Sequence, residues 1–251
     1  MESLRDLFEA LDNASKSDLL LSLIAGTEPM LRSRLRGLLT QIRRAPNEHA
    51  HTAKCLVEIV KIAYLLGDYA HRRAYFASSS TRPDAPTRRL YRMSARWFRQ
   101  ASLALSRLPD TAGLRVAKRM FAPAIRQNIF TSNWMALPED KRATDETIRH
   151  DVVGYFNDAR FLIGYAGPKA KFEASLSAAS YASRLGIENE CLEFLGVAYQ
   201  VDDRLPSYVN KRPPGFRKSL SADPDHVLSV KLINSGALLT HCQSSAATRS
   251  A

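Results

Sequence analysis

The sequence predicts an all-α protein folded as a single-domain helical bundle. Apolar residues recur at the i, i+3, i+4 and i+7 spacing of amphipathic helices in several segments, and no segment shows the alternating pattern of a strand. Apolar residues make up 45% of the 251 residues, which is enough for a sizeable core. We therefore expect one domain over residues 1–240, followed by a disordered tail over residues 241–251 that is too polar to pack.

Helical spacing appears first at residues 4–11 and again at residues 31–42. Residues 55–66 are apolar on nearly every side, which is typical of a helix buried inside a bundle. Residues 78–87 are rich in Ser, Thr and Pro, so they are predicted to form a loop.

After this loop, an apolar stripe that includes Trp97 predicts a helix over residues 90–108. Four arginines lie on an adjoining face of that helix: Arg89, Arg92, Arg96 and Arg99. Residues 114–130 continue as a helix, which Pro123 is expected to kink or break. Further helices are predicted over about residues 144–164, 169–185, 187–203 and 227–239, the first of them with an N-cap within residues 144–147.

The cysteines, the apolar runs and the first residues of the sequence together predict the cellular compartment. Cys55, Cys191 and Cys242 are odd in number and show none of the paired spacing of a zinc site, which fits a reducing compartment. No run of about 18 apolar residues predicts a membrane span. The first residues also lack the charged and apolar regions of a secretory signal. These observations predict a cytoplasmic protein.

The net charge of +11 is concentrated in one segment. Residues 82–126 hold eleven Lys or Arg against two Asp, a net charge of +9. Such a block attracts phosphate groups, whether of a nucleic acid, a lipid surface or a diphosphate substrate. A solvated helix face without a ligand is the alternative explanation.

Other combinations of catalytic residue types are weak in this sequence. The six histidines are scattered, and His49 and His51 fall in a predicted loop, so metal ligation by histidine is not expected. No serine stands in a nucleophile-elbow motif. No glycine-rich loop of the Walker type occurs either, which argues against a nucleotide-binding site of that kind.

Two adjacent carboxylates, Asp202 and Asp203, end the apolar helix predicted over residues 187–203. Adjacent carboxylates repel each other, and a divalent cation or a basic group relieves that repulsion. Mg²⁺ binds one or two carboxylates together with substrate phosphates, so the pair is a candidate metal site. Taken alone, the pair is better explained by a solvated helix end.

The residues around this pair resemble a known family. Gly196-Val-Ala-Tyr-Gln-Val-Asp-Asp resembles the Gly-x-x-Phe-Gln-x-x-Asp-Asp motif of trans-isoprenyl diphosphate synthases, and Lys169-Ala-Lys-Phe resembles the family's Lys-Thr-x-x-Leu-Phe helix. Glu58-Ile-Val-Lys-Ile-Ala-Tyr-Leu-Leu-Gly-Asp, followed by Arg72-Arg73, is similar to its first aspartate-rich helix. Asn210-Lys-Arg-Pro-Pro-Gly-Phe-Arg-Lys loosely matches its Gly-Lys loop. These motifs follow the family's order over about residues 35–220.

The resemblance implies an isoprenoid-synthase-like bundle of helices around a central cavity, with Mg²⁺ as the cofactor. It implies prenyl transfer between allylic and isopentenyl diphosphates, or a catalytically impaired relative that supports an active partner subunit. Because synthases of this family are usually dimers, it also implies a homodimer or a heteromeric synthase.

The site residues are carried over by the same resemblance. The implied roles are catalysis for Lys169 and Gln200, metal binding for Asp68, Asp202 and Asp203, and diphosphate binding for Arg72, Arg73, Lys211 and Lys218. In this alignment Tyr69 and Arg72 stand where the first motif has further aspartates, and Arg204 stands at an aspartate position of the second. Both aspartate-rich motifs are therefore incomplete, and active and impaired forms both stay open.

A basic all-α nucleic-acid-binding protein of the nucleocapsid or nucleoid kind is the alternative, with residues 82–126 following a phosphate backbone. A helical interaction module with a solvated, arginine-rich surface is a third possibility. Trp97 lies on the apolar stripe, which favours core packing over stacking on bases. The prenyl-synthase hypothesis requires Asp68 and Asp203 to face one cavity, and the nucleic-acid hypothesis requires one continuous basic groove.

Overall fold

The computed structural model describes residues 18–44, 49–77, 83–201, 227–238 and 240–243. All regular structure within these ranges is helical, which confirms the predicted all-α class. The chain divides into two compact units, Met1–Tyr155 and Phe156–Ala251. The single domain over residues 1–240 and the central cavity stay predictions, and the helix expected at residues 4–11 lies outside the described ranges.

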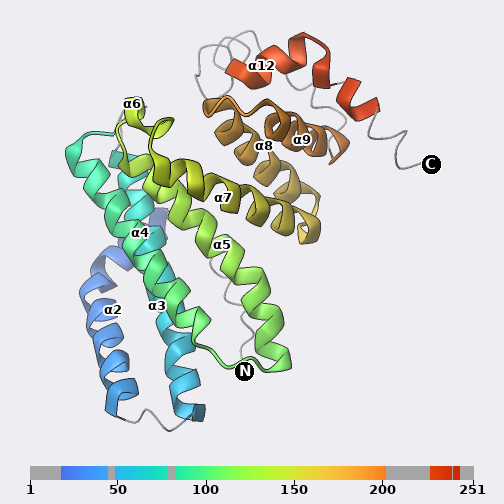
Figure 1. Ribbon diagram of the computed structural model, residues 1–251. Coiled ribbons are helices and arrows are strands. Elements are labelled where there is room, and N and C mark those ends of the chain that lie inside the picture. Colours follow the sequence, from blue (N-terminus) through green and yellow to red (C-terminus); the bar gives the residue numbers. More distant parts are fainter. Residues whose placement is uncertain (1–17, 45–48, 78–82, 202–226, 239, 244–251) are drawn as a thin grey trace. The chain divides into compact units, whose positions relative to one another are not determined.

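The first unit contains five described helices: α2 (Asp18–Arg44), α3 (His49–Ala77), α4 (Ala85–Ser106), α5 (Ala112–Ala136) and the short α6 (Glu139–Arg142) (Figure 1). α3 packs against both α2 and α4, and α4 packs against α5. Ile59, Ala63 and Leu66 of α3 are at most 1% exposed, as the all-round apolar sequence of this helix predicted.

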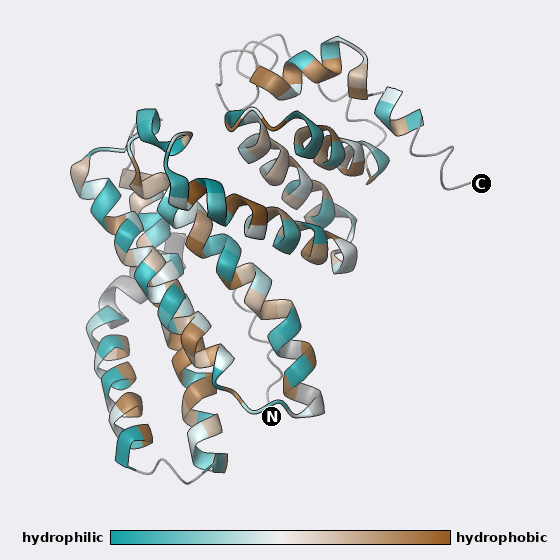
Figure 2. Cartoon of the chain, in the orientation of Figure 1, coloured by the Kyte–Doolittle hydropathy of each residue, from teal (hydrophilic) through white to brown (hydrophobic). Residues whose placement is uncertain are grey.

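Brown and teal residues alternate along these long helices in Figure 2, the amphipathic pattern that the sequence predicted. The predicted loop over residues 78–87 ends earlier than expected, because α4 already begins at Ala85. The Asp84 carboxylate caps this helix by accepting a hydrogen bond from the Thr87 backbone N–H (2.8 Å). Pro86 is tolerated because the first helical turn does not use its missing N–H group.

Two further sequence predictions need correction. α3 starts at His49, so His49 and His51 are helical rather than in a loop. α5 continues through Pro123 without the predicted break, because Phe121 and Ile125 on either side of it are buried in the core and hold the helix in place; the kink stays a prediction. Phe98 of α4 is buried (2% exposed), and Trp97 is half-buried and packs against the same core cluster, as its place on the apolar stripe predicted.

The second unit contains α8 (Pro168–Arg184), α9 (Glu188–Val201) and α12 (Val227–Asn234), which pack against one another. α7 (Glu146–Tyr165) begins in the first unit and ends in the second, and Asp145, within the segment predicted to cap it, accepts a hydrogen bond from the Ile148 N–H. Residues 240–243 are helical, and residues 244–251 of the expected tail lie outside the described ranges. None of the described helices is long and apolar enough to cross a membrane.

Candidate functional site

The structure places the predicted site residues in three groups. Asp68, Arg72 and Arg73 lie together on α3 of the first unit. Lys169 belongs to the first turn of α8 and the exposed Gln200 to the last turn of α9, both in the second unit. The remaining four predicted residues, Asp202, Asp203, Lys211 and Lys218, lie outside the described ranges.

Asp68 and Arg72 form an ion pair on one face of α3. Arg72 Nε donates to Asp68 Oδ2 at 2.7 Å, and both side chains are about a quarter exposed (27% and 26%). A charge-assisted hydrogen bond of this length is among the stronger polar contacts in proteins. The carboxylate that the family resemblance assigns to a metal is therefore already paired with a cation.

Arg73 has different partners from its neighbour. Its guanidinium lies over the Tyr69 ring (5.5 Å to the centroid), and Nη1 is 3.9 Å from Glu28 Oε2 on α2. The 3.9 Å contact is too long for a hydrogen bond, and the Arg73 side chain is 49% exposed. Of the two arginines, Arg73 is thus the one held loosely at the surface.

Of the three predicted metal-binding residues, Asp68 is the one that the described part of the chain contains. No group of three or more His, Cys, Asp or Glu side chains comes together among the described residues. Asp68 offers one carboxylate, and the Arg72 guanidinium beside it opposes a second positive charge. We therefore derive no reaction step through a metal ion.

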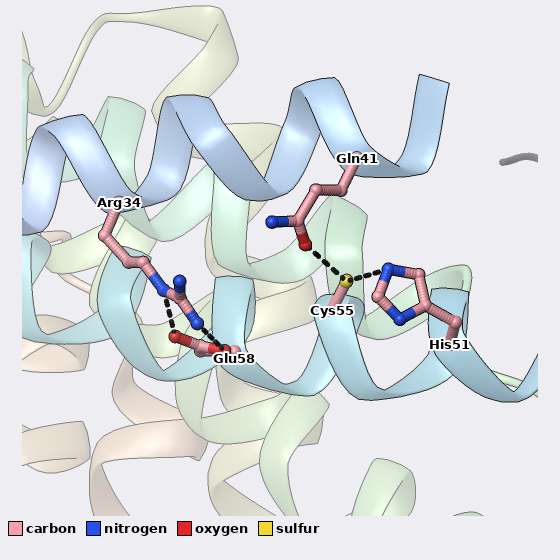
Figure 3. Close-up of polar contacts among 5 residues, drawn as sticks. All are labelled: Arg34, Gln41, His51, Cys55 and Glu58. Atoms are coloured by element: carbon pink, nitrogen blue, oxygen red, sulfur yellow. Dashed lines mark hydrogen bonds and ion pairs between the residues drawn. The ribbon is translucent and has the colours of Figure 1, made fainter. Parts of the chain in front are cut away.

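Glu58, the first residue of the motif on α3, has a structural partner. Its carboxylate accepts two hydrogen bonds from Arg34 of α2, at 2.7 Å from Nε and 3.2 Å from Nη2 (Figure 3). One turn earlier on α3, the buried Cys55 Sγ lies 3.6 Å from Gln41 Oε1 and 3.5 Å from His51 Nε2. These contacts join α2 to α3 and leave Cys55 only 4% exposed, which suits packing rather than nucleophilic chemistry.

A buried polar chain that the sequence analysis missed runs from α3 through α5 to α4. His71 Nδ1 lies 3.2 Å from Ser132 Oγ, Ser132 Oγ lies 3.0 Å from Ser94 Oγ, and Ser94 donates to the Gly67 carbonyl at 2.8 Å. Ser94 and Ser132 are both fully buried. The Gly67–His71 spacing of four residues on α3 was the available signal, but the two serines come from other helices.

The donor and the acceptor of each hydrogen bond in this polar chain follow from the Gly67 carbonyl, which can only accept. Because the Ser94 proton goes to the Gly67 carbonyl, Ser94 Oγ must accept from Ser132. Ser132 has then used its own proton, so it accepts from a protonated Nδ1 of His71. His71 is accordingly the Nδ1–H tautomer, and the buried serines serve as its anchor rather than as nucleophiles.

The environment of His71 predicts a pH dependence. Burial lowers the pKa of His71; the Asp68 charge opposes this and the Arg72 charge adds to it. As the pH falls, the unfolded chain therefore protonates His71 at a higher pH than the folded chain does. The contribution of neutral His71 to folding stability is complete above the pKa of the unfolded chain, about 6.5. That stability is lost as the pH falls from there through the lower folded pKa.

Urea unfolding of the full chain at neutral and mildly acidic pH measures this effect. Tryptophan fluorescence reports the first unit alone, because both tryptophans, Trp97 and Trp134, lie there. In His71→Asn the amide nitrogen replaces the Nδ1 donor without titrating, so we expect a flatter pH profile than that of the wild type. The same acid-induced loss in both proteins would contradict the role of His71.

The basic segment is exposed on α4. Arg89, Arg92, Arg96, Arg99 and Arg107 are all exposed, whereas Arg88 is half-buried and donates to the Pro83 carbonyl (2.7 Å). Lys118 is also half-buried and donates to the Leu108 carbonyl (2.8 Å). Two of the eleven predicted cations are thus half-buried and bonded to backbone carbonyls, while the exposed arginines of α4 form a row.

Comparison with known proteins finds no family model, curated protein or solved structure that matches this chain.

Proposed function

We propose that this protein is an isoprenyl diphosphate synthase-like protein that binds the diphosphate group of an allylic or isopentenyl ester and is catalytically impaired. The ion pair between Asp68 and Arg72 carries this proposal. The family resemblance expects several metal-binding aspartates on this part of α3. A single aspartate paired with an arginine supplies a fixed cation instead of a place for metal ions.

The arginines on α3 support binding of a diphosphate without its turnover. Arginine binds phosphate oxygens well, because its planar guanidinium presents several donors and stays charged. Arg73 is half exposed and its nearest carboxylate is 3.9 Å away, so it can turn toward a diphosphate at small cost. Prenyl transfer also needs the departing diphosphate to be neutralised, which metal ions do far more strongly than one or two arginines. An impaired subunit of this kind is expected to act in a homodimer or beside an active synthase.

Binding and turnover are tested separately on the full chain. We expect isothermal titration with inorganic pyrophosphate to show binding that Arg73→Gln weakens roughly tenfold, the loss of about one charge-assisted contact. Arg36→Gln removes an exposed arginine of α2 and serves as the matched control, with no change expected. Incubation with isopentenyl and allylic diphosphates and Mg²⁺ should give no extractable product above a boiled sample.

Two results would overturn parts of this proposal. Absence of pyrophosphate binding, or equal weakening by Arg73→Gln and Arg36→Gln, removes the diphosphate site on α3. Product formation that is abolished by Asp68→Asn or Asp203→Ala shows an active, metal-dependent synthase and removes the impairment.

A further inference from the structure

The outer side of α4 carries a straight row of arginines. Arg89, Arg92, Arg96 and Arg99 follow one another at intervals of three, four and three residues, and Arg107 caps the helix end. This spacing keeps them on one side of the helix. At a rise of about 1.5 Å per residue the row is roughly 27 Å long. We call these five residues the arginine face.

The charge of this face is not neutralised within the described part of the chain. α4 contains five arginines and no Asp or Glu, and the neighbouring α5 likewise contains four cations and no acid. No ion pair involves Arg89, Arg92 or Arg96 among the described residues, and Arg99 donates only to the neutral Asn133 amide (3.3 Å). The carboxylate at the start of the helix, Asp84, is used as its N-cap.

The remaining side chains on α4 decide which polyanion suits this face. Phe98 is buried, and Trp97 is half-buried with the Arg32 guanidinium over its ring (5.6 Å), so α4 offers no exposed ring on which unpaired bases could stack. Leu103 is the one large apolar residue of α4 that is strongly exposed (56%), which is too little to insert into a lipid layer. A nucleic-acid duplex, with its rigid and regular phosphate backbone, fits these features better than a single strand or a membrane.

We propose that the arginine face of α4 binds the phosphate backbone of a nucleic-acid duplex without reading its base sequence. A duplex presents one phosphate per about 1.7 Å of its axis, so phosphates are in excess along the row and its five arginines can neutralise about four or five of them. Arginine suits this contact because its fork matches phosphate oxygens. The face is separate from the Asp68 and Arg73 region of α3, so the inference does not depend on the diphosphate site.

Fluorescence anisotropy of the full chain with a labelled DNA duplex of about 20 base pairs and mixed sequence tests the proposal. Each phosphate neutralised adds about −0.9 to the slope of log affinity against log salt, so we expect a slope of about −4. The triple variant Arg89→Gln, Arg92→Gln, Arg96→Gln should bind at least about tenfold more weakly at low salt, with a slope shallower by about 3. A second duplex of unrelated sequence should bind equally well.

The matched control removes three exposed arginines from α2 of the same unit: Arg36→Gln, Arg43→Gln and Arg44→Gln. It changes the net charge by the same amount and should keep at least half of the wild-type affinity. Equal loss in both triple variants would show that binding follows net charge, which overturns the proposal. So would absence of duplex binding at low salt, or tighter binding to the single strand or to anionic lipid vesicles.

Discussion

Replacing Phe98 with alanine should destabilise the first unit by about 3–5 kcal/mol. Its ring is 2% exposed and belongs to the core cluster that α2, α3, α4 and α5 form together. It meets the Tyr64 ring edge-on, with centroids 5.3 Å apart, and approaches the α3 backbone at Gly67. Removal leaves a cavity lined by rigid helices, which cannot close around it. Urea unfolding followed by tryptophan fluorescence and by circular dichroism measures the loss.

The contact between Gly67 and Phe98 provides a control for this prediction. A Cβ atom at Gly67 would lie 3.0 Å from the Phe98 ring, so Gly67→Ala alone should cost about 1–3 kcal/mol through overpacking. In a Phe98→Leu background the ring atoms are gone, and the cost of Gly67→Ala should fall. Strictly additive costs of the two substitutions would contradict this packing arrangement.

Ser132→Ala should lower the folding stability of the first unit by about 1–3 kcal/mol, the second of the two large effects that we expect. Ser132 is fully buried and accepts the Nδ1–H of His71. Without its oxygen that donor has no partner in the polar chain, and the cost of an unsatisfied buried group exceeds the gain from one ordinary hydrogen bond. The pH dependence assigned to His71 should change in the same variant, because the Nδ1–H tautomer loses its anchor.

Two other serines serve as comparisons. Ser94→Ala should cost less than Ser132→Ala, because the Ser132 hydroxyl can turn to the carbonyl four residues earlier on α5 and the Gly67 carbonyl keeps its bond within α3. Ser106→Ala, at the exposed end of α4, should stay within about 0.5 kcal/mol of the wild type. A larger effect of Ser94→Ala than of Ser132→Ala would contradict this expected order of costs.

The family resemblance supplied the site residues, but the structure decided their contacts. The motif on α3 includes Glu58, Asp68 and Arg72, and α3 folds as one helix as its spacing predicted. Spacing within a helix also makes an Asp68–Arg72 pair four residues apart possible. The partner of Glu58 is Arg34 on another helix, and no local pattern identifies such a residue. The expectation that Asp68 faces Asp203 stays a prediction, since Asp203 lies outside the described ranges.

The sequence by itself determined the all-α class, the position of most helices and the burial of α3, because hydrophobic periodicity is a local property that repeats along each helix. It also determined that α4 carries a row of arginines, since the same periodicity places them on one side. Only the tertiary structure decided that Phe98 is fully buried while Trp97 stays half-buried against the same core, that α5 passes through Pro123 unbroken, and that His71 joins Ser94 and Ser132. These outcomes depend on which helices pack together, and contacts between residues far apart in the chain leave no periodic pattern in the sequence.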